Sequence, residues 1–435
     1  MPGSENRRSC PRVVVIGAGA AGSMAAIFAA TGGAETILLE RTRDGGRKIL
    51  ISGGGRCNVL PMRVDESRFV TDSSPNSLRK ILRSWPLAGQ IDFFQNELRI
   101  PLAEEPQSAK LFPVSNRARD VRDGLLAYAT RAGTTIRNET IVTGFAPAKD
   151  GWLIESESSP AIECDAVIVA TGGLSVPNTG SDGLGIRELL RLGHTINPVY
   201  PALTPLTSAG ESPFAGLSGV SLRVTITARD DVTTRSATAT GGFLFTHKGY
   251  SGPAVLDVSH VAVRSRAEAN GSARVTVQWT ELDAAAWETA LQPHGNRTLA
   301  GAVRAHLPDR LAGVLIGLAG CDPARSLAEL RRDERVRVIN ALVACPLPWS
   351  GDEGYRKAEV TGGGINLAEV DPRTMESRRH SRLYICGEVL DAFGPVGGYN
   401  FLWSWATGRL AGISAARRTA TASPSPGLSA TPPRG

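Results

Sequence analysis

The sequence predicts an α/β fold built on a parallel sheet that a long insert interrupts, and three observations predict it. First, the β-branched run at 13–16 leads through a glycine-rich turn into a helix of small residues. Second, the run CDAVIVA at 164–170 is apolar throughout, as in parallel strands buried on both faces. Third, the α/β pattern stops after His194 and returns near Glu359. A chain of 435 residues also suggests two or three domains.

The segment at 13–40 carries the fingerprint of a dinucleotide-binding turn. Gly17 permits the tight turn, Gly19 lets backbone N–H groups approach a pyrophosphate, and Gly22 allows close helix–strand packing. Glu40, 18 residues after Gly22, is placed to bind an adenosine ribose, which favours FAD or NAD over NADP. A merely structural glycine turn is the alternative. The residues assigned to this site are Gly17, Ala18, Gly19, Ala20, Ala21, Gly22, Glu40 and Arg41.

A second glycine-rich loop follows at 45–58. Its three consecutive glycines leave backbone N–H groups uncovered, and Lys48 and Arg56 add positive charge beside the expected phosphate or flavin ring. A flexible surface loop is the alternative. Cys57 is the cysteine expected nearest the ring, although a buried structural thiol is favoured because no resolving cysteine is adjacent. The cofactor residues assigned here are Lys48, Ser52, Gly53, Gly54, Gly55, Arg56, Cys57 and Asn58.

Two further segments complete the expected cofactor site. The turn Thr171-Gly172 closes the strand at 164–170 and lets the backbone pass close to a cofactor, although a simple β-turn would look the same. Late in the chain, a strand–Gly–acid turn precedes a Gly-Gly helix entry whose N–H groups suit the anionic N1/O2 edge of a reduced flavin. The residues assigned in this late segment are Gly387, Glu388, Gly397, Gly398, Tyr399 and Asn400.

The remaining pattern predicts the other elements in order. Apolar spacing predicts helices within 78–97 and 115–132, strands at 135–143 and 152–155, and a helix at 183–193. Short β-rich runs alternate with turns from 201 to 278, and helical patterning follows from 281 to 344. Strands return at 357–366 and 382–390, before a helix at 400–417. The predicted divisions are a disordered N-terminus at 1–11, a cofactor domain at 12–197 and 347–417, a β-rich insert at 198–280, a helical insert at 281–346, and a disordered tail at 418–435.

Composition limits the kind of protein. The net charge is +6, but the densest basic cluster, at 331–337, is broken by acids, so no nucleic-acid partner is expected. No run of about 18 apolar residues and no signal peptide are visible, so we expect neither membrane association nor secretion. Six widely spaced cysteines fit a reducing cytoplasm, and the six histidines lack metal spacing. His247 could line a substrate cleft, although a surface-turn histidine is the more ordinary interpretation.

Together these motifs resemble the YhiN/BaiN-type family of bacterial FAD-dependent oxidoreductases, also called aminoacetone-oxidase-family FAD-binding enzymes. The most specific blocks are GRKILISGGGRCN at 46–58 and GEVLDAFGPVGGYN at 387–400, and the resemblance runs from Arg12 to Arg417. It implies a Rossmann-like FAD-binding domain split by a β-barrel-like subdomain and a small helical subdomain. It also implies that the following residues lie near FAD: Gly17, Gly19, Gly22, Glu40, Lys48, Cys57, Asn58, Gly387, Glu388, Gly398 and Asn400. Phe393 stands where family members more often carry a smaller or acidic residue.

The sequence therefore predicts an FAD-dependent oxidoreductase that acts on a small organic molecule. With one dinucleotide fingerprint, any NADH or NADPH used as reductant would dock transiently. Family members linked to reduction of conjugated C=C bonds favour that reaction, and an oxidase acting on a small amine with O2 is a second expectation. A third is a flavoprotein that binds RNA or another partner and uses FAD structurally or as a redox sensor. Cys57 and His247 are the candidate catalytic residues; the substrate and the oligomeric state are not predicted.

Overall fold

A five-stranded parallel sheet forms the centre of the first domain. The computed structural model describes residues 10–157, 159–208, 212–268 and 271–417. The strands lie in the order β20-β10-β1-β2-β6, and every neighbouring pair is parallel. Their bounds are β1 Arg12–Ile16, β2 Glu35–Leu39, β6 Thr135–Arg137, β10 Ala166–Val169 and β20 Leu383–Ile385. All four residues of β10 are buried, as its unbroken apolar run predicts.

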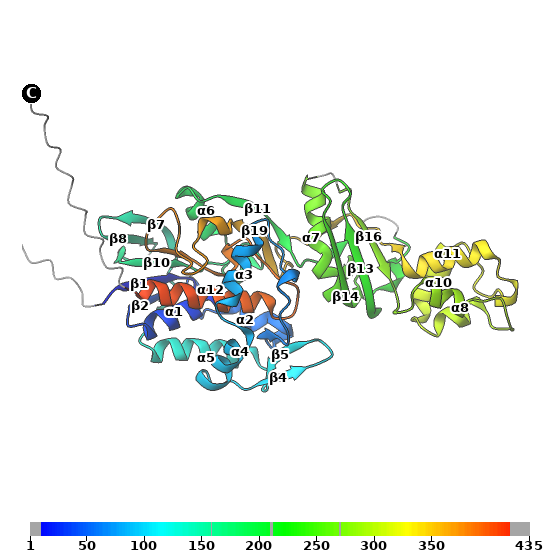
Figure 1. Cartoon of the computed structure of the whole chain (residues 1–435), viewed down its shortest axis with the longest axis horizontal. Coiled ribbons are helices and arrows are strands. Elements are labelled where there is room, and N and C mark those ends of the chain that lie inside the picture. The colour runs from blue at the N-terminus through cyan, green and yellow to red at the C-terminus, as the bar shows by residue number, and fades with distance from the viewer. Residues whose placement is uncertain (1–9, 158, 209–211, 269–270, 418–435) are drawn as a thin grey trace, which may run out of the picture.

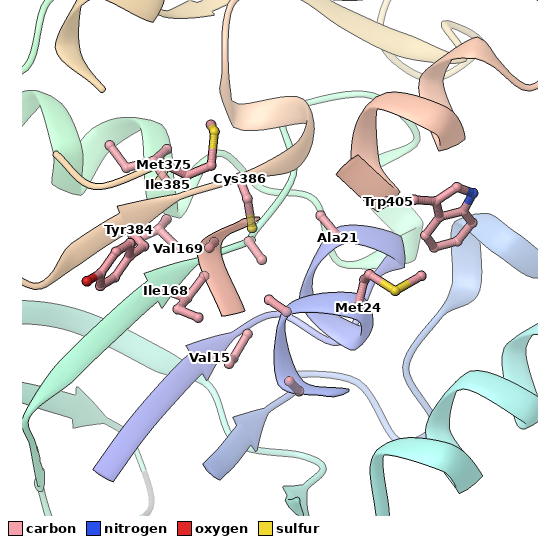
Figure 2. Close-up of a cluster of buried hydrophobic side chains, with 14 of the residues drawn as sticks. Val15, Ala21, Met24, Ile168, Val169, Met375, Tyr384, Ile385, Cys386 and Trp405 are labelled. Carbon is pink, nitrogen blue, oxygen red and sulfur yellow. The ribbon is translucent and has the colours of Figure 1, made fainter. Parts of the chain in front are cut away.

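Two helices pack together against this sheet. They are α1 (Ala20–Thr31) and α12 (Tyr399–Ala416), far apart in the sequence but in contact along their length. Glycines allow this approach, because a Cβ on Gly408 would lie 2.3 Å from the carbonyl oxygen of Ala21. Figure 2 shows the core beneath them, where Val15, Ile168 and Ile385 from three strands meet side chains of both helices. The C-terminal helix thus completes the domain that the first strand begins.

Smaller elements surround this centre. An antiparallel sheet of β3, β5 and β4 carries the loop before α5, and a second one of β7, β8 and β9 lies beyond β10 (Figure 1). The bounds of these strands are β3 Leu60–Pro61, β4 Leu102–Glu105, β5 Lys110–Pro113, β7 Val142–Ala148, β8 Gly151–Ser156 and β9 Ile162–Cys164. The bounds of the helices are α2 Arg47–Ile51, α3 Pro75–Arg83, α4 Leu87–Asp92, α5 Ala118–Arg131 and α6 Leu184–Arg191.

The insert is a seven-stranded antiparallel sheet followed by helices. The sheet has the order β17-β16-β13-β14-β15-β12-β18. Helices α8, α10 and α11 lie at the end of the molecule away from the parallel sheet, whereas α7 lies on the side of the insert nearer to it (Figure 1). The bounds of the strands are β12 Leu206–Thr207, β13 Ser221–Arg229, β14 Ser236–Phe245, β15 Gly249–Ser251, β16 Arg274–Gln278, β17 Cys345–Pro346 and β18 Gly351–Asp352. The bounds of the helices are α7 Pro253–Glu268, α8 Ala284–Ala290, α9 Leu299–Arg304, α10 Asp309–Leu318 and α11 Arg332–Val343.

The chain enters and leaves the insert along a pair of strands. β11 (Ile196–Ala202) pairs antiparallel with β19 (Val360–Ile365), and farther out β12 pairs with β18. The two junctions therefore lie side by side, as expected from the points where the α/β pattern stops and returns. Helix α7 also joins the insert to the first domain, because Arg264 forms a two-pronged ion pair with Asp72.

The α/β class and the Rossmann-like parallel sheet are confirmed, but several predicted elements differ. The largest difference is α7, which lies where only strands and turns were predicted. Its sequence PAVLDVSHVAVRSRAE is rich in valine, and packing against β13 and β14 overrides the β preference of those residues. The strand predicted at 135–143 is divided into β6 and β7. The strand predicted at 382–390 ends at Ile385, where a 3₁₀ turn at Gly387–Val389 follows.

The inserted strands and helices share one hydrophobic core. Trp279 at the end of β16, Trp287 in α8 and Leu342 in α11 belong to one buried cluster, so the β-rich and helical inserts pack as one unit. The sheet also includes β18, which lies beyond the predicted boundary at 346. The predictions of disorder at 418–435 and for residues 1–9 fall outside the described residues. Within the described residues, no helix combines the length and hydropathy needed to cross a membrane.

Candidate cofactor site

A cavity of about 690 Å³ opens at the carboxyl ends of the parallel strands. Its wall begins at the turn after β1, follows the end of β2 and the loop after β10, and includes the N-terminus of α12. Pro253 and Leu256 of α7 line it as well, so the insert contributes part of the wall. Ligands of open α/β sheets bind outside the carboxyl ends of the strands, and this cavity occupies that place.

The turn between β1 and α1 presents bare backbone to the cavity. Gly19 precedes α1 with no side-chain cap, and a Cβ placed on it would meet nothing within 4 Å. Gly17 has a φ of +101°, and its Cβ would lie 2.7 Å from the carbonyl oxygen of Ala170. A Cβ on Gly22 would lie 1.8 Å from the carbonyl oxygen of Gly17. The three glycines thus have the three positions that the fingerprint requires, and the uncapped helix end attracts an anion.

Glu40 lies at the cavity and is already hydrogen-bonded within the protein. Its Oε2 accepts from the Ala18 N–H at 2.9 Å, and its Oε1 accepts from the backbone and hydroxyl of Thr42 at 2.8 and 2.6 Å. A carboxylate has about four acceptor positions, so one position on Oε2 stays open to a ribose hydroxyl. Glu40 therefore has two tasks, since it also fixes the glycine turn.

Substituting Glu40 separates these two tasks. We expect Glu40→Ala to weaken FAD binding by about 1–3 kcal/mol, because the ribose loses a charged acceptor and the Ala18 N–H loses its partner. Glu40→Gln keeps an acceptor oxygen and should lose less affinity. Fluorescence titration of the apoprotein with FAD measures both. Equal dissociation constants for all three proteins would mean that Glu40 does not bind the ribose.

The second helix end at the cavity belongs to α12. Gly397 and Gly398, with φ of +125° and +91°, precede it, and no side chain caps the helix or places an acid in its first turn. A Cβ on Gly398 would lie 2.4 Å from the backbone of Leu60, so only glycine fits there. Gly397, Gly398 and Asn400 line the cavity. The end of an 18-residue helix thus offers free N–H groups to a second anionic group.

Between the two helix ends lies a largely buried ion pair. Lys48 Nζ is 2.7 Å from Glu388 Oε2 and donates to Ser175 Oγ at 2.6 Å. Glu388 Oε1 also accepts from Ser175 Oγ at 2.6 Å and from the Thr361 N–H at 3.0 Å. Burial alone would raise the pKa of Glu388, but the Lys48 charge and these hydrogen bonds outweigh burial and hold that pKa below its usual value.

The glycine loop at 52–58 only partly faces the cavity. Ser52, Gly53, Gly54 and Asn58 line it, and Gly53 to Gly55 all have positive φ. Arg56 points elsewhere, to Glu105 at 2.8 Å and over the ring of Phe112. Cys57 is fully buried outside the lining, and burial raises the pKa of its thiol to about 12. Its thiol form therefore fits the structural interpretation better than a redox role.

Most of the predicted cofactor residues gather in this cavity. Those in the lining are Gly17, Gly19, Ala20, Ala21, Glu40, Arg41, Lys48, Ser52, Gly53, Gly54, Asn58, Thr171, Gly172, Glu388, Gly397, Gly398 and Asn400. Those outside the lining are Ala18, Gly22, Gly55, Arg56, Cys57, Gly387 and Tyr399. The Tyr399 hydroxyl instead accepts a hydrogen bond from the Asp65 N–H, and the Gly387 N–H donates a hydrogen bond to the Thr407 hydroxyl of α12.

His247 lies away from the cavity. It is exposed in the turn between β14 and β15 and does not line the cavity, so the structure gives it no place in a substrate cleft. Phe393 is also outside this lining. It is buried where α7 meets the first domain, with its ring edge against His260 and Tyr200.

Six charged residues of the lining were not predicted as site residues: Arg47, Lys110, Asp182, Arg356, Lys357 and Glu359. Lys110 comes from β5 and Glu359 immediately precedes β19, so neither belongs to a glycine motif. The lining residues from α7 were missed because that helix was not predicted. In the sequence, Glu359 is marked only by its position directly before a strand that returns the chain to the first domain.

The residues present fit a flavin dinucleotide. Such a cofactor is anionic at its pyrophosphate and, when reduced, at the N1/O2 edge of its ring, and the cavity offers one uncapped helix end at each of two places. The open space at Gly19 would be filled by any side chain. The described residues contain no group of three His, Cys, Asp or Glu side chains that could hold a metal ion.

Comparison with known proteins extends this description. Residues 11–414 match the HI0933-like protein Rossmann domain family. A protein of Escherichia coli named ribosomal RNA dihydrouridine synthase is 31% identical over 91% of this chain and 95% of its own length. A protein of Clostridium scindens named 3-dehydro-bile acid delta(4,6)-reductase is also 31% identical, over 94% of this chain and 99% of its own length.

Among solved structures, 3-ketosteroid delta1-dehydrogenase from Sterolibacterium denitrificans aligns with a TM-score of 0.51 and 10% identity. The alignment covers 93% of this chain and 99% of that protein. At this identity the likeness concerns the fold alone.

Proposed function

The chain belongs to the HI0933-like family of FAD-dependent Rossmann oxidoreductases, and from that premise we propose that it reduces a C=C bond conjugated to a carbonyl group. The observation that carries this proposal is the cavity, which joins the cofactor segments to a lining of α7 and the charged residues Lys110 and Glu359. The two relatives are named for reactions of this kind. Dihydrouridine is uridine with two hydrogens added across a ring C=C bond next to a carbonyl, and the bile acid reductase is named for delta(4,6) bonds of a 3-dehydro acid.

The chain would hold FAD between its two helix ends. Gly19 and the start of α1 would receive the pyrophosphate, Glu40 the ribose, and Gly397 and Gly398 at α12 the N1/O2 edge of the ring. Bound FAD supplies hydride transfer to and from organic molecules. The protein positions the substrate, excludes water and supplies protons.

The part of the cavity beyond these segments suits a small ring with a carbonyl group. Leu256, Val360, Val396 and Phe401 give it apolar walls, and Lys110 adds a cation. Such a lining, mostly apolar with a few polar groups, is typical of sites for small molecules. Planar stacking of a substrate ring against a flavin needs walls of this kind.

The charge distribution of the helical insert does not favour an RNA partner for that part of the chain. Residues 281–346 contain eight Arg and eight Asp or Glu, so the helical part of the insert has no net charge without its histidines. Arg325, Arg335 and Arg337 are held in ion pairs there. An RNA-binding surface needs clustered, free cations, and these arginines do not provide one.

We infer that NADH or NADPH reduces the enzyme by transient docking. Arg356 and Lys357 are exposed at the cavity and have no ion pair with the residues that the structure describes, so they are available to an anionic donor. Anaerobic mixing of the holoprotein with NADH and, separately, with NADPH tests this inference. Rapid bleaching of the oxidised flavin absorbance by one of them supports a reductase.

The same experiment tests amine oxidation. An oxidase would be bleached by a small amine without a nicotinamide, and would then form hydrogen peroxide when air is admitted. Bleaching by aminoacetone but by neither nicotinamide would overturn the proposed reductase. Bleaching by a nicotinamide, followed by reoxidation with an unsaturated ketone under argon, would support it.

A further inference from the structure

Glu359 and Lys110 are charged side chains of the cavity wall whose role the contacts described so far do not explain. Neither side chain forms a hydrogen bond or ion pair within 10–157, 159–208, 212–268 and 271–417. The other acids of the lining are engaged: Glu40 with Thr42, Glu388 with Lys48, and Asp182 with Arg41. Unpaired charges that face a binding cavity are available to a ligand.

Backbone hydrogen bonds fix the position of Glu359 in the cavity wall. Its N–H donates to the carbonyl of Leu203 at 3.1 Å, and its own carbonyl accepts from Ser175 Oγ at 3.4 Å. Two residues later, the Thr361 N–H donates to Glu388 at 3.0 Å. Glu359 therefore stands next to the Lys48–Glu388 pair, directly before the strand β19 that returns the chain to the cofactor domain.

Lys110 reaches the same region from another sheet. Its side-chain carbons lie 3.2–3.9 Å from the position that a Cβ on Gly397 would have, so its stem passes the glycine turn before α12. The flavin ring is expected at that turn. Lys110 and Glu359 thus come from separate elements to the ring end of the cavity, where α7 also contributes Leu256.

The surroundings of Glu359 raise its pKa above the usual value although the residue is exposed to the cavity. Its carboxyl group is open to the cavity, but protein surrounds the cavity on its other sides, and this burial raises its pKa to about 7. Lys110 opposes the rise and Asp257 of α7 adds to it. Arg356 and Lys357 precede it on its own loop. Asp257 differs from Glu359 because the Val396 N–H donates to it at 2.7 Å and Arg68 lies 3.5 Å away.

We propose that Glu359 is the proton donor of the reaction, and that Lys110 binds the carbonyl oxygen of the substrate. This proposal rests on the proposed reduction of a conjugated C=C bond. It assigns catalytic contacts to two residues that lie outside every glycine motif of the cofactor site.

Reduced flavin, when bound, would supply the hydride. A hydride forms a new C–H bond at the β-carbon, and the π electrons move so that negative charge develops on the carbonyl oxygen beside the Lys110 ammonium. The Glu359 O–H bond then breaks, and its proton forms the C–H bond at the α-carbon. The substrate has gained two hydrogens, Glu359 is left as a carboxylate, and solvent restores its proton.

The test compares Glu359→Gln with Glu104→Gln as a matched control. Glu104 is exposed on β4, the partner strand of Lys110's own β5, and does not line the cavity. Each holoprotein is reduced with dithionite under argon and mixed with 2-cyclohexen-1-one in a stopped-flow instrument. We expect Glu359→Gln to slow flavin reoxidation about 10²-fold or more, with reduction by the nicotinamide unchanged. The control should react like the unmodified protein.

A second readout does not depend on turnover. Infrared difference spectra across a pH titration report the protonated carboxyl of Glu359, as the band that Glu359→Gln removes. We expect this band to titrate near pH 7. Lys110→Met should move the titration to higher pH, and Asp257→Asn should move it to lower pH, because each removes one of the charges that act on Glu359.

The outcomes separate the two proposals. If the unmodified protein does not react with the ketone, the proposed function fails and the proton-donor assignment fails with it. If the unmodified protein reacts and Glu359→Gln reacts equally fast, only the proton-donor assignment is overturned. A carboxyl band that titrates near pH 4.5 and ignores Lys110→Met would also overturn it.

Discussion

Replacing Lys48 with methionine is expected to destabilise the folded protein by about 3 kcal/mol. The substitution leaves Glu388 largely buried without its cation, and removing one partner of a buried pair costs more than the pair itself contributes. The Ser175 hydroxyl also loses the hydrogen bond that Lys48 donates to it. Chemical denaturation of the apoprotein measures this loss. Lys149→Met, an exposed lysine on the first domain, is the control and should change the unfolding free energy by less than about 0.5 kcal/mol.

The pH dependence of the stability lost in Lys48→Met shows whether the broken ion pair causes that loss. In the unmodified protein the pKa of Glu388 is lowered, so its contribution is complete above its unfolded pKa and is lost as pH falls through the lower folded value. Without Lys48, only the hydrogen bonds from Ser175 and Thr361 oppose the effect of burial, so the folded pKa of Glu388 rises. The penalty of Lys48→Met should therefore grow as pH rises above the unfolded pKa. A second change, Glu388→Gln, should recover part of the stability. A penalty independent of pH would contradict the ion-pair explanation.

Replacing Gly22 with alanine should have a still larger effect. The added Cβ would lie 1.8 Å from the Gly17 carbonyl oxygen and 3.2 Å from the side chain of Ala170, so α1 must move away from β1. We expect a loss of more than about 4 kcal/mol of unfolding free energy, which is among the largest effects of single substitutions. Because the same movement displaces the helix end at the pyrophosphate position, FAD binding should be lost as well.

Gly313→Ala provides the control for Gly22→Ala. Gly313 lies inside α10, and a Cβ there would meet nothing within 4 Å. Alanine has the better helix propensity, so this variant should be as stable as the unmodified protein or more stable by up to about 1 kcal/mol. Calorimetry of the three proteins with and without FAD distinguishes loss of the fold from loss of the cofactor. Normal FAD binding by Gly22→Ala would show that the helix can move without cost.

Much of the cofactor domain could be predicted because its signals are local. The turn at Gly17–Gly22 needs its glycines for close backbone contacts, and those contacts follow one another along the chain. The apolar run of β10 also needs no distant information. Helix α7 could not be predicted in this way, because its valines take a helical form only through packing on β13 and β14.

The charged part of the site depends on long-range contacts. Lys48 and Glu388 are 340 positions apart, and nothing near either residue shows that they pair. Lys110 reaches the cavity only because β5 lies beside the turn before α12. Sequence motifs therefore predicted many of the residues that line the cavity, whereas the residues proposed to act on the substrate became visible when distant strands were placed together.

The proposed reaction of this flavoprotein is the addition of two hydrogens across a C=C bond next to a carbonyl group. It is tested most directly by anaerobic single turnover of the reduced holoprotein, with mass spectrometry of the product. The substrates are a 3-oxo-Δ4 bile acid and a ribosomal RNA transcript that lacks dihydrouridine. We expect the bile acid to reoxidise the flavin without O2 and to gain the mass of two hydrogens. Gain of mass by the RNA alone would contradict the small-molecule assignment, and reoxidation by neither substrate until air is admitted would contradict the reductase itself.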